Sequence, residues 1–274
     1  VPSLHRRALP LRSPPLSLRS RMGLLVQPSF DYRHLMENVL CNISAFRFHR
    51  VPPQVLMLMP VLPAPEFDHD KSLLMRHPLI VGCIGCPVHL LFGDSARAYA
   101  GKRVVNHVWR GDRPKGAITG TPLGLDVTDP LFTLLTMAPV VSEYLLVMAM
   151  YEFCGTFGVF QPSPLIEALL AQAYAEHLLD PSYGWRRMVD ANGNKTNLWR
   201  RPPLISLDGL RAYVPQITGM RGAKRFSAAA ASITGATASP FEAQASMVLG
   251  MGRRRGGGGL DLENNVEIPL SRSA

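Results

Sequence analysis

The stretch LFTLLTMAPVVSEYLLVMAM (131–150) decides the class of fold, because no other segment of the chain is long and apolar enough to be a candidate membrane span. Pro139, Ser142 and Glu143 lie near its centre, and a carboxylate at the middle of a bilayer costs about 2.5–3.5 kcal/mol. We therefore expect two buried helices, broken near Ala138 and Pro139, in a globular protein with no membrane partner.

The composition around this stretch is that of a globular protein. The chain has 274 residues, of which 47% are apolar and 18% are charged, so it can bury a core and is not disordered throughout. Many of its 24 prolines and 23 glycines fall in the first 65 residues and the last 25. This distribution predicts loosely ordered ends around a folded middle.

The charge is only a weak indication of a partner. The formal charge of +9, from 29 basic and 20 acidic residues, suits a nucleic acid, because each neutralised phosphate releases counterions. Over half of this excess comes from five arginines that precede the first acidic residue: Arg6, Arg7, Arg12, Arg19 and Arg21. The folded part is therefore much less basic than the whole chain.

The cysteines and the N-terminal residues bear on localisation. Four cysteines in a chain of this size do not form the dense framework of a secreted domain, so we expect a reducing, cytoplasmic compartment. Prolines at positions 2, 10, 14 and 15 interrupt any secretory signal. The arginine-rich start is either a transit peptide or translated sequence upstream of a true start at Met22, and its composition favours the second.

Periodicity and turn signals predict helices and strands on both sides of the apolar stretch. The clearest helix is 163–179. The segment 116–129 is typical of a hairpin that ends at a helix start, with Thr128 or Asp129 as the cap and Pro130 as the first helical residue. Further helices are expected at 31–50 (one or two short ones), 207–214, 221–233 and 239–249. Strands are expected at 80–84, 88–92, 104–109 and 265–270, and the alternative for 78–92 is a strand followed by a helix start.

Cys83 and Cys86 form a C-x-x-C pair, a spacing found in redox and zinc sites. A redox pair needs a helix N-terminus after the first cysteine to lower its pKa, whereas Pro87 and the flanking apolar runs favour a turn between strands. A zinc site needs four ligands, and no second pair lies at a useful spacing. We therefore interpret both as small buried cysteines in strands and expect no metal site. The sequence also lacks a nucleophile elbow, a Walker loop, a dinucleotide fingerprint and an H-E-x-x-H motif.

Two groups of basic residues are candidates for contacts with nucleic-acid phosphates. The first group lies in the predicted helix 221–233, and the second follows the predicted helix 239–249. The alternative for the second group is a solvated helix end, where cations suit the helix dipole. The candidates are Arg221, Lys224, Arg225, Arg253, Arg254 and Arg255.

Glu242 is the one candidate for a catalytic carboxylate. It belongs to Ser239-Pro240-Phe241-Glu242, which carries two helix-start signals, a capping box and a proline at the first helical position. In a capping box its role is purely structural and is worth about 0.5–2 kcal/mol.

Three stretches together resemble bacterial proteins related to the antitoxin AbiEi, in which an AbiEi-like region precedes a Vsr-like domain of the PD-(D/E)XK nuclease superfamily. The resemblance covers roughly residues 30–274, and it departs from the family at Asp129-Pro130-Leu131, where a usual glutamate is missing. The stretches are ISAFRFHRVPPQV (43–55), VTDPLFTLLTMAPVVSEYLLVMAMYEFCGTFG (127–158), and GMRGAKRFSAAAASITGATASPFEAQASMVLGM (219–251) with GGGGLDLENNVEI (256–268).

The resemblance implies that Glu242 matches the acidic residue of the first nuclease helix, which commonly approaches the metal site. The stretch 264–270 matches the strand just before the catalytic core. The acidic strands that would bind Mg²⁺ and activate water come after that strand, beyond Ala274. We therefore expect a capping role for Glu242, no cofactor in this chain, and no catalysis by the chain as given; Mg²⁺ would be a cofactor only of a complete nuclease core.

The residues and the resemblance together predict an α+β fold with a helical N-terminal module, a mixed α/β middle domain, a helical linker and an incomplete α/β nuclease-like C-terminal part. The polar, turn-rich segment 180–203 is interpreted as the connection between two domains. The predicted parts are a basic, proline-rich disordered leader (1–30), an AbiEi-like α+β domain (31–160), a helix and linker (161–203) and a truncated Vsr-like domain (204–274).

The favoured function is a DNA-associated regulatory or defence-system protein of the toxin–antitoxin type, with DNA and a toxin-like protein as partners. One alternative is a truncated Mg²⁺-dependent DNA endonuclease, whose reading frame would continue into an aspartate and an E-x-D/K strand. A second alternative is a non-enzymatic protein-interaction module, which would co-purify with a neighbouring gene product and lack affinity for DNA.

Overall fold

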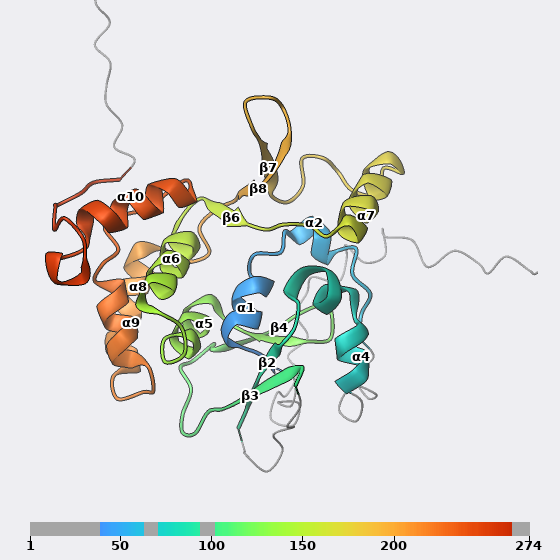
Figure 1. The fold of residues 1–274 in the computed structure, drawn as a ribbon. Helices are drawn as coiled ribbons and strands as arrows, with labels where there is room; N and C mark the ends of the chain where they lie inside the picture. Colours follow the sequence, from blue (N-terminus) through green and yellow to red (C-terminus); the bar gives the residue numbers. More distant parts are fainter. Residues whose placement is uncertain (1–38, 63–70, 94–101, 265–274) are drawn as a thin grey trace, which may run out of the picture. The chain divides into compact units, whose positions relative to one another are not determined.

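The structure is a computed structural model that describes residues 39–62, 71–93 and 102–264 (Figure 1). The chain divides after His34 into two units, and all described residues belong to the second, Leu35–Ala274. The predicted leader, the start at Met22 and the predicted strand 265–270 lie outside the described residues.

The described part of the chain is a mixed α/β fold that combines helices with two sheets, which agrees with the predicted α+β class. Its helices are α1 (Asn42–Phe48), α2 (Pro53–Leu56), α4 (Lys71–Arg76), the π-helix η3 (Ile80–Ile84), α5 (Pro130–Met137), α6 (Glu143–Cys154), α7 (Pro164–Ala175), α8 (Leu207–Tyr213), the 3₁₀ turn η5 (Pro215–Ile217), α9 (Ala223–Ala230), α10 (Pro240–Gly250) and the 3₁₀ turn η6 (Arg253–Arg255). Its strands are β1 (Val39–Leu40), β2 (Val88–Phe92), β3 (Val104–Val108), β4 (Ile118–Gly120), β5 (Asp126–Thr128), β6 (Phe157–Val159), β7 (Arg186–Val189) and β8 (Lys195–Arg200).

The larger sheet has the strand order β3-β2-β1-β5-β4. β2 and β3 are parallel, with Val88 opposite Val104, and β1 lies antiparallel to β2 and parallel to β5. The predicted hairpin is confirmed, because β4 and β5 pair antiparallel with Ile118 opposite Thr128. β3 and β4 therefore lie at the two edges of this sheet.

The apolar stretch 131–150 forms α5 and α6, as predicted, with a break between Met137 and Glu143. Asp129 caps α5 by accepting hydrogen bonds from two backbone amides of its first turn, and Ser142 caps α6 in the same way with one amide. Among the described residues, every helix is too short or too polar to span the hydrocarbon core of a membrane.

A second, smaller sheet occupies a region where no strands were predicted. β7 and β8 form an antiparallel hairpin within the segment 180–203, and β6 pairs with the other side of β8. Asp190 orders the hairpin turn, because its carboxylate accepts hydrogen bonds from the backbone amides of Asn192 and Asn194. Trp199 is the only fully buried side chain of these two strands, so the hairpin lacks the apolar alternation by which strands are recognised.

Residues 80–84 form the π-helix η3 and not the predicted strand. Ile80 and Ile84 are buried while Val81 is 65% exposed, which is a helical spacing of apolar residues and not the alternation of a strand. The prediction of buried cysteines in strands was therefore wrong for this region. Cys83 lies in η3 and is only partly buried, and Cys86 is exposed.

Buried apolar side chains form two clusters on opposite faces of the larger sheet. Along β2, Leu91 belongs to one cluster, and its neighbours Leu90 and Phe92 belong to the other, because successive side chains of a strand point to opposite faces. The first cluster joins α5 and α6 to α8, α9 and α10, with Phe226 fully buried within it. This shared core holds α9 and α10 beside α6, and the candidate functional residues lie in these two helices or next to them (Figure 1).

Candidate functional site

Glu242 forms the predicted capping box at the start of α10. The hydroxyl of Ser239 accepts a hydrogen bond from the backbone amide of Glu242 (3.2 Å) and donates one to its Oε1 (3.1 Å). The Oε2 of Glu242 accepts a hydrogen bond from the backbone amide of Ala238 (2.8 Å). Both carboxylate oxygens are therefore engaged in closing the N-terminus of this helix.

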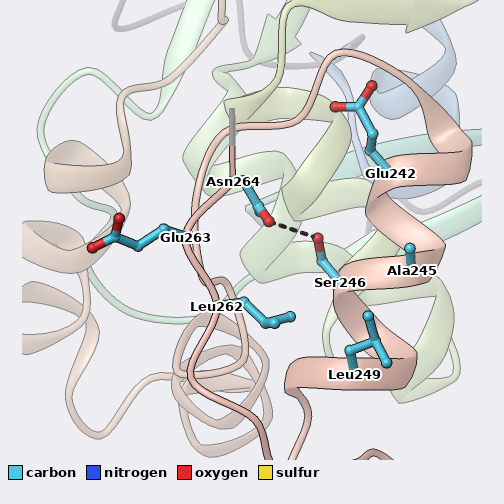
Figure 2. A pocket seen from close by; sticks show the side chains of 7 residues that line it. All are labelled: Glu242, Ala245, Ser246, Leu249, Leu262, Glu263 and Asn264. Atoms are coloured by element: carbon cyan, nitrogen blue, oxygen red, sulfur yellow. Dashed lines mark hydrogen bonds between the residues drawn. The ribbon is translucent and has the colours of Figure 1, made fainter. Parts of the chain in front are cut away.

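A cavity of about 230 Å³ lies between α10 and the segment that follows it, and Glu242 is on its rim (Figure 2). In its middle the hydroxyl of Ser246 donates a hydrogen bond to Oδ1 of Asn264 (3.0 Å), and Nδ2 of Asn264 donates one to the hydroxyl of Thr234 (3.2 Å). Its lining residues are Glu242, Ala245, Ser246, Leu249, Leu262, Glu263 and Asn264.

The carboxylates at this cavity do not converge. Figure 2 shows that Glu263 points away from α10, while Glu242 is directed toward the start of that helix. A Mg²⁺ ion needs several oxygen ligands gathered around one point. Within residues 39–62, 71–93 and 102–264, no three His, Cys, Asp or Glu side chains are grouped closely enough to hold a metal ion. The cavity is a largely apolar recess that is crossed by the hydrogen bond between Ser246 and Asn264.

The six candidate basic residues are all exposed and lie around α9. Lys224 lies in the first turn of α9, and Arg221 lies just before the helix. η6 lies against the end of α9, because Arg255 donates hydrogen bonds to the carbonyl of Ala228 (2.7 Å) and the hydroxyl of Ser232 (2.9 Å). The structure thus brings together two groups that are nearly thirty residues apart in sequence.

Three of these six residues have partners within the protein, since Nε of Arg253 donates a long hydrogen bond to the carbonyl of Gly258 (3.5 Å). Arg225 donates a hydrogen bond to the carbonyl of Val141, and Arg255 also lies 3.4 Å from the carboxylate of Glu143. In the part of the chain that the structure describes, Arg255 is the only one of the six that forms an ion pair. The exposed side chains of Arg221, Lys224, Arg253 and Arg254 are available for contacts with an anionic partner.

The sequence analysis did not predict a pair of histidines on neighbouring strands. Nδ1 of His89 in β2 lies 2.8 Å from Nε2 of His107 in β3, and the rings are stacked at 5.0 Å. Burial lowers the pKa of His107 from 6.5 to about 4, and the nearby charges of His89 and Arg221 add to this effect. The pKa of His89 is also lowered, first by burial and then by the charge of Arg47. Both rings are therefore neutral at pH 7. No local motif signals this pair, because the contact depends on the register of two strands.

The sequence analysis also did not predict a buried cluster around Glu152. Its carboxylate receives hydrogen bonds from the guanidinium of Arg50 and from the backbone amide of Val159 (2.9 Å). Arg201 donates to the backbone carbonyl of Glu152 (2.6 Å), and burial lowers the pKa of Arg201 to about 10. The cluster ties α6 to the end of α1 and to the chain after β8, so its role is structural.

In comparisons with known proteins, no protein-family profile, no curated protein and no solved structure matches this chain.

Proposed function

We propose that the chain is a DNA-associated regulatory protein of a bacterial defence system, AbiEi-like and of the toxin–antitoxin type, that does not itself cleave DNA. The observation that carries this proposal is the gathering of six exposed basic residues around α9, five of them without an ion-pair partner among the described residues. A toxin-like protein and a cytoplasmic location are further parts of the same proposal.

The charge of the region supports a polyanionic partner. Residues 204–264 contain seven Lys or Arg residues against four Asp or Glu residues, a local excess of three positive charges. α9 has eight residues, so its two ends are about 11 Å apart. Basic groups at both ends therefore offer two separate contacts to phosphates, and such contacts position a duplex without reading its sequence.

The finer layout of the proposal follows the sequence resemblance. A helical N-terminal module and a mixed α/β domain precede a helical linker and an incomplete Vsr-like part from residue 204 onward. Glu242 serves there as a helix cap, and Mg²⁺ would act only in a complete nuclease core. The hydrogen bonds of Glu242 to Ala238 and Ser239 support the capping role.

The test is the salt dependence of binding to a fluorescein-labelled DNA duplex, measured by anisotropy with the full chain. Each phosphate contact contributes a slope of about −0.9 to a plot of log K against log salt. The double variants Arg221→Ala/Lys224→Ala and Arg253→Ala/Arg254→Ala are each expected to weaken binding and make this slope shallower by up to about 2.

The matched control is Arg186→Ala/Lys195→Ala, which removes two exposed basic residues from the β7–β8 hairpin. It should leave both affinity and slope nearly unchanged. Equal losses in the control, or no salt-dependent binding by the parent chain, would refute the DNA-binding surface. Cleavage of the duplex in Mg²⁺ that disappears in Glu242→Ala would instead favour the endonuclease, and capture of a toxin-like partner without DNA affinity would favour the interaction module.

A further inference from the structure

A second cavity, of about 370 Å³, lies between the end of α1, the π-helix η3 and the end of β6. It is larger than the recess of about 230 Å³ beside α10, and its volume falls within the range of about 300–1,000 Å³ that is typical of small-molecule sites. η3 packs beside α1, so the two helices form neighbouring walls of this cavity (Figure 1). No motif in the sequence marks the cavity, because its walls come from three separate segments.

Two arginines of one helical turn line the cavity. Arg47 lies in the last turn of α1, and the backbone amide of Arg50 donates to the carbonyl of Arg47 (3.2 Å), so the turn continues through Arg50. Side chains three residues apart on a helical turn are neighbours. Nη1 of Arg47 donates a hydrogen bond to the carbonyl of Ile84 (2.8 Å), which holds this guanidinium against the end of η3.

These arginines carry more positive charge than the surrounding protein neutralises. The carboxylate of Glu152 accepts hydrogen bonds from Arg50, and its charge also opposes the lowering of the Arg201 pKa by burial. Among the described residues, Arg47 has no ion-pair partner, and the lining of the cavity includes no Asp or Glu. Three guanidinium groups therefore share one carboxylate, and the charge of the half-buried Arg47 is left unbalanced.

Both guanidinium groups have N–H groups that the protein does not use. Glu152 occupies Nε and Nη2 of Arg50, and the carbonyl of Ile84 occupies Nη1 of Arg47. Nη1 of Arg50 and both Nε and Nη2 of Arg47 have no acceptor among the described residues. Guanidinium groups bind phosphate and carboxylate through charge-assisted hydrogen bonds from such N–H groups.

The rest of the lining carries no charge. Val81 is 65% exposed and offers an apolar surface, and the ring of Phe160 lines the cavity from the end of β6. Cys83 is a neutral thiol, because burial raises its pKa to about 12. A cavity with cationic groups and an apolar wall suits a ligand that has an anionic group and an apolar part.

We propose that this cavity binds a small organic anion whose phosphate or carboxylate group is held by Arg47 and Arg50. The apolar part of the ligand contacts Val81 and Phe160. None of the residues that line the cavity belongs to the six basic residues around α9, so the inference does not rest on DNA binding.

The test is a titration of the ¹⁵N-labelled full chain with phenyl phosphate, followed by NMR. The backbone amides of Gly82, Gly85 and Gln161 should shift in a saturable manner, with a dissociation constant on the order of 1 mM or tighter for a ligand of this size. Inorganic phosphate lacks the apolar part and phenol lacks the charge, so each should bind at least about tenfold more weakly. Benzoate in place of phenyl phosphate shows whether the site prefers a carboxylate or a phosphate.

Two positions in the cavity carry the variants. Arg47→Ala should weaken the binding of phenyl phosphate at least about tenfold, whereas Arg47→Lys keeps the charge and should weaken it less. Val81→Asp places a negative charge in the lining and should weaken binding about threefold or more. This second variant tests the site independently, because Arg47→Ala also removes the hydrogen bond to Ile84, while Val81 is exposed and its replacement leaves the chain able to fold.

The matched control is Arg186→Ala, which removes an exposed arginine from β7 and should leave the affinity within about twofold. The double variant Arg221→Ala/Lys224→Ala, which is expected to weaken DNA binding, should do the same. The proposal is overturned if neither phenyl phosphate nor benzoate shifts these amides in a saturable manner, or if either control weakens binding as much as Arg47→Ala does. It is also overturned if inorganic phosphate or phenol binds as tightly as phenyl phosphate.

Discussion

Replacing Glu152 by Gln should destabilise the chain severely, because this carboxylate balances the charge of Arg50 at a buried position. Its side chain is 4% exposed, and its Oε1 accepts hydrogen bonds from Nε of Arg50 (2.8 Å) and from the amide of Val159 (2.9 Å). Gln has nearly the same shape, but it removes the negative charge and turns an NH₂ group toward the guanidinium or the amide. Removing one partner of a buried ion pair costs about 3–5 kcal/mol, and we expect a loss in that range.

The chain contains its own control for this prediction. Glu167 pairs with Arg187 in a similar contact, but the side chain of Glu167 is 35% exposed, so water screens the charge that would be left behind. Glu167→Gln should therefore cost at most about 1 kcal/mol. Both variants and the parent are compared by urea unfolding at pH 7, followed by circular dichroism. If the two variants lose the same free energy of unfolding, burial does not determine how much the Glu152–Arg50 pair contributes to stability, and the prediction is refuted.

Three further outcomes are expected. Acid should destabilise the chain through His89 and His107, because their pKa values in the folded state lie below the ordinary 6.5. The folded state binds these protons less readily than the unfolded state, so the free energy of unfolding is unaffected above about pH 6.5 and decreases as the pH falls toward 4. Replacing both with Phe should flatten the acid side of a profile of stability against pH. Some acid dependence should remain, because burial also lowers the pKa of His49 to about 4. Ser239→Ala should cost about 0.5–2 kcal/mol in urea unfolding, while Ser239→Asp should retain most of the cap; equal losses would argue against the capping box. Phe226→Ala should cost about 3–5 kcal/mol in the same assay, because its ring is fully buried between α8, α9 and α6, and a loss below about 1 kcal/mol would mean that the core collapses into the space.

The helices were predictable from sequence because their start signals are local. Asp129-Pro130, Ser163-Pro164 and Ser239-Pro240 each place a capping side chain directly before a proline, and each begins a helix of the structure. Such signals act within four residues, so no knowledge of the remaining chain is needed to read them. The break in the apolar stretch is local for the same reason.

The features that were missed depend on contacts between distant segments. His89 and His107 meet only because β2 and β3 pair in one register, and Glu152 meets Arg50 across 102 residues of sequence. The run IVGCI (80–84) contains only apolar residues and glycine, so its composition does not distinguish a strand from a helical turn. The basic residues of the candidate site were named from sequence, but their gathering around α9 follows from the hydrogen bonds of Arg255.

Glu242 shows how one side chain is suited to two roles that compete. As a cap, its carboxylate satisfies the amide of Ala238 and the hydroxyl of Ser239 and is held at the start of α10. As a metal ligand, it would have to turn toward further oxygens, which leaves a partly buried amide without a partner at a cost of about 1–3 kcal/mol. Only a bound cation with additional ligands would offset that cost, since Glu263 points away from it across the cavity. The local hydrogen bonds therefore stabilise the capping conformation of Glu242 over one that is turned toward a metal ion.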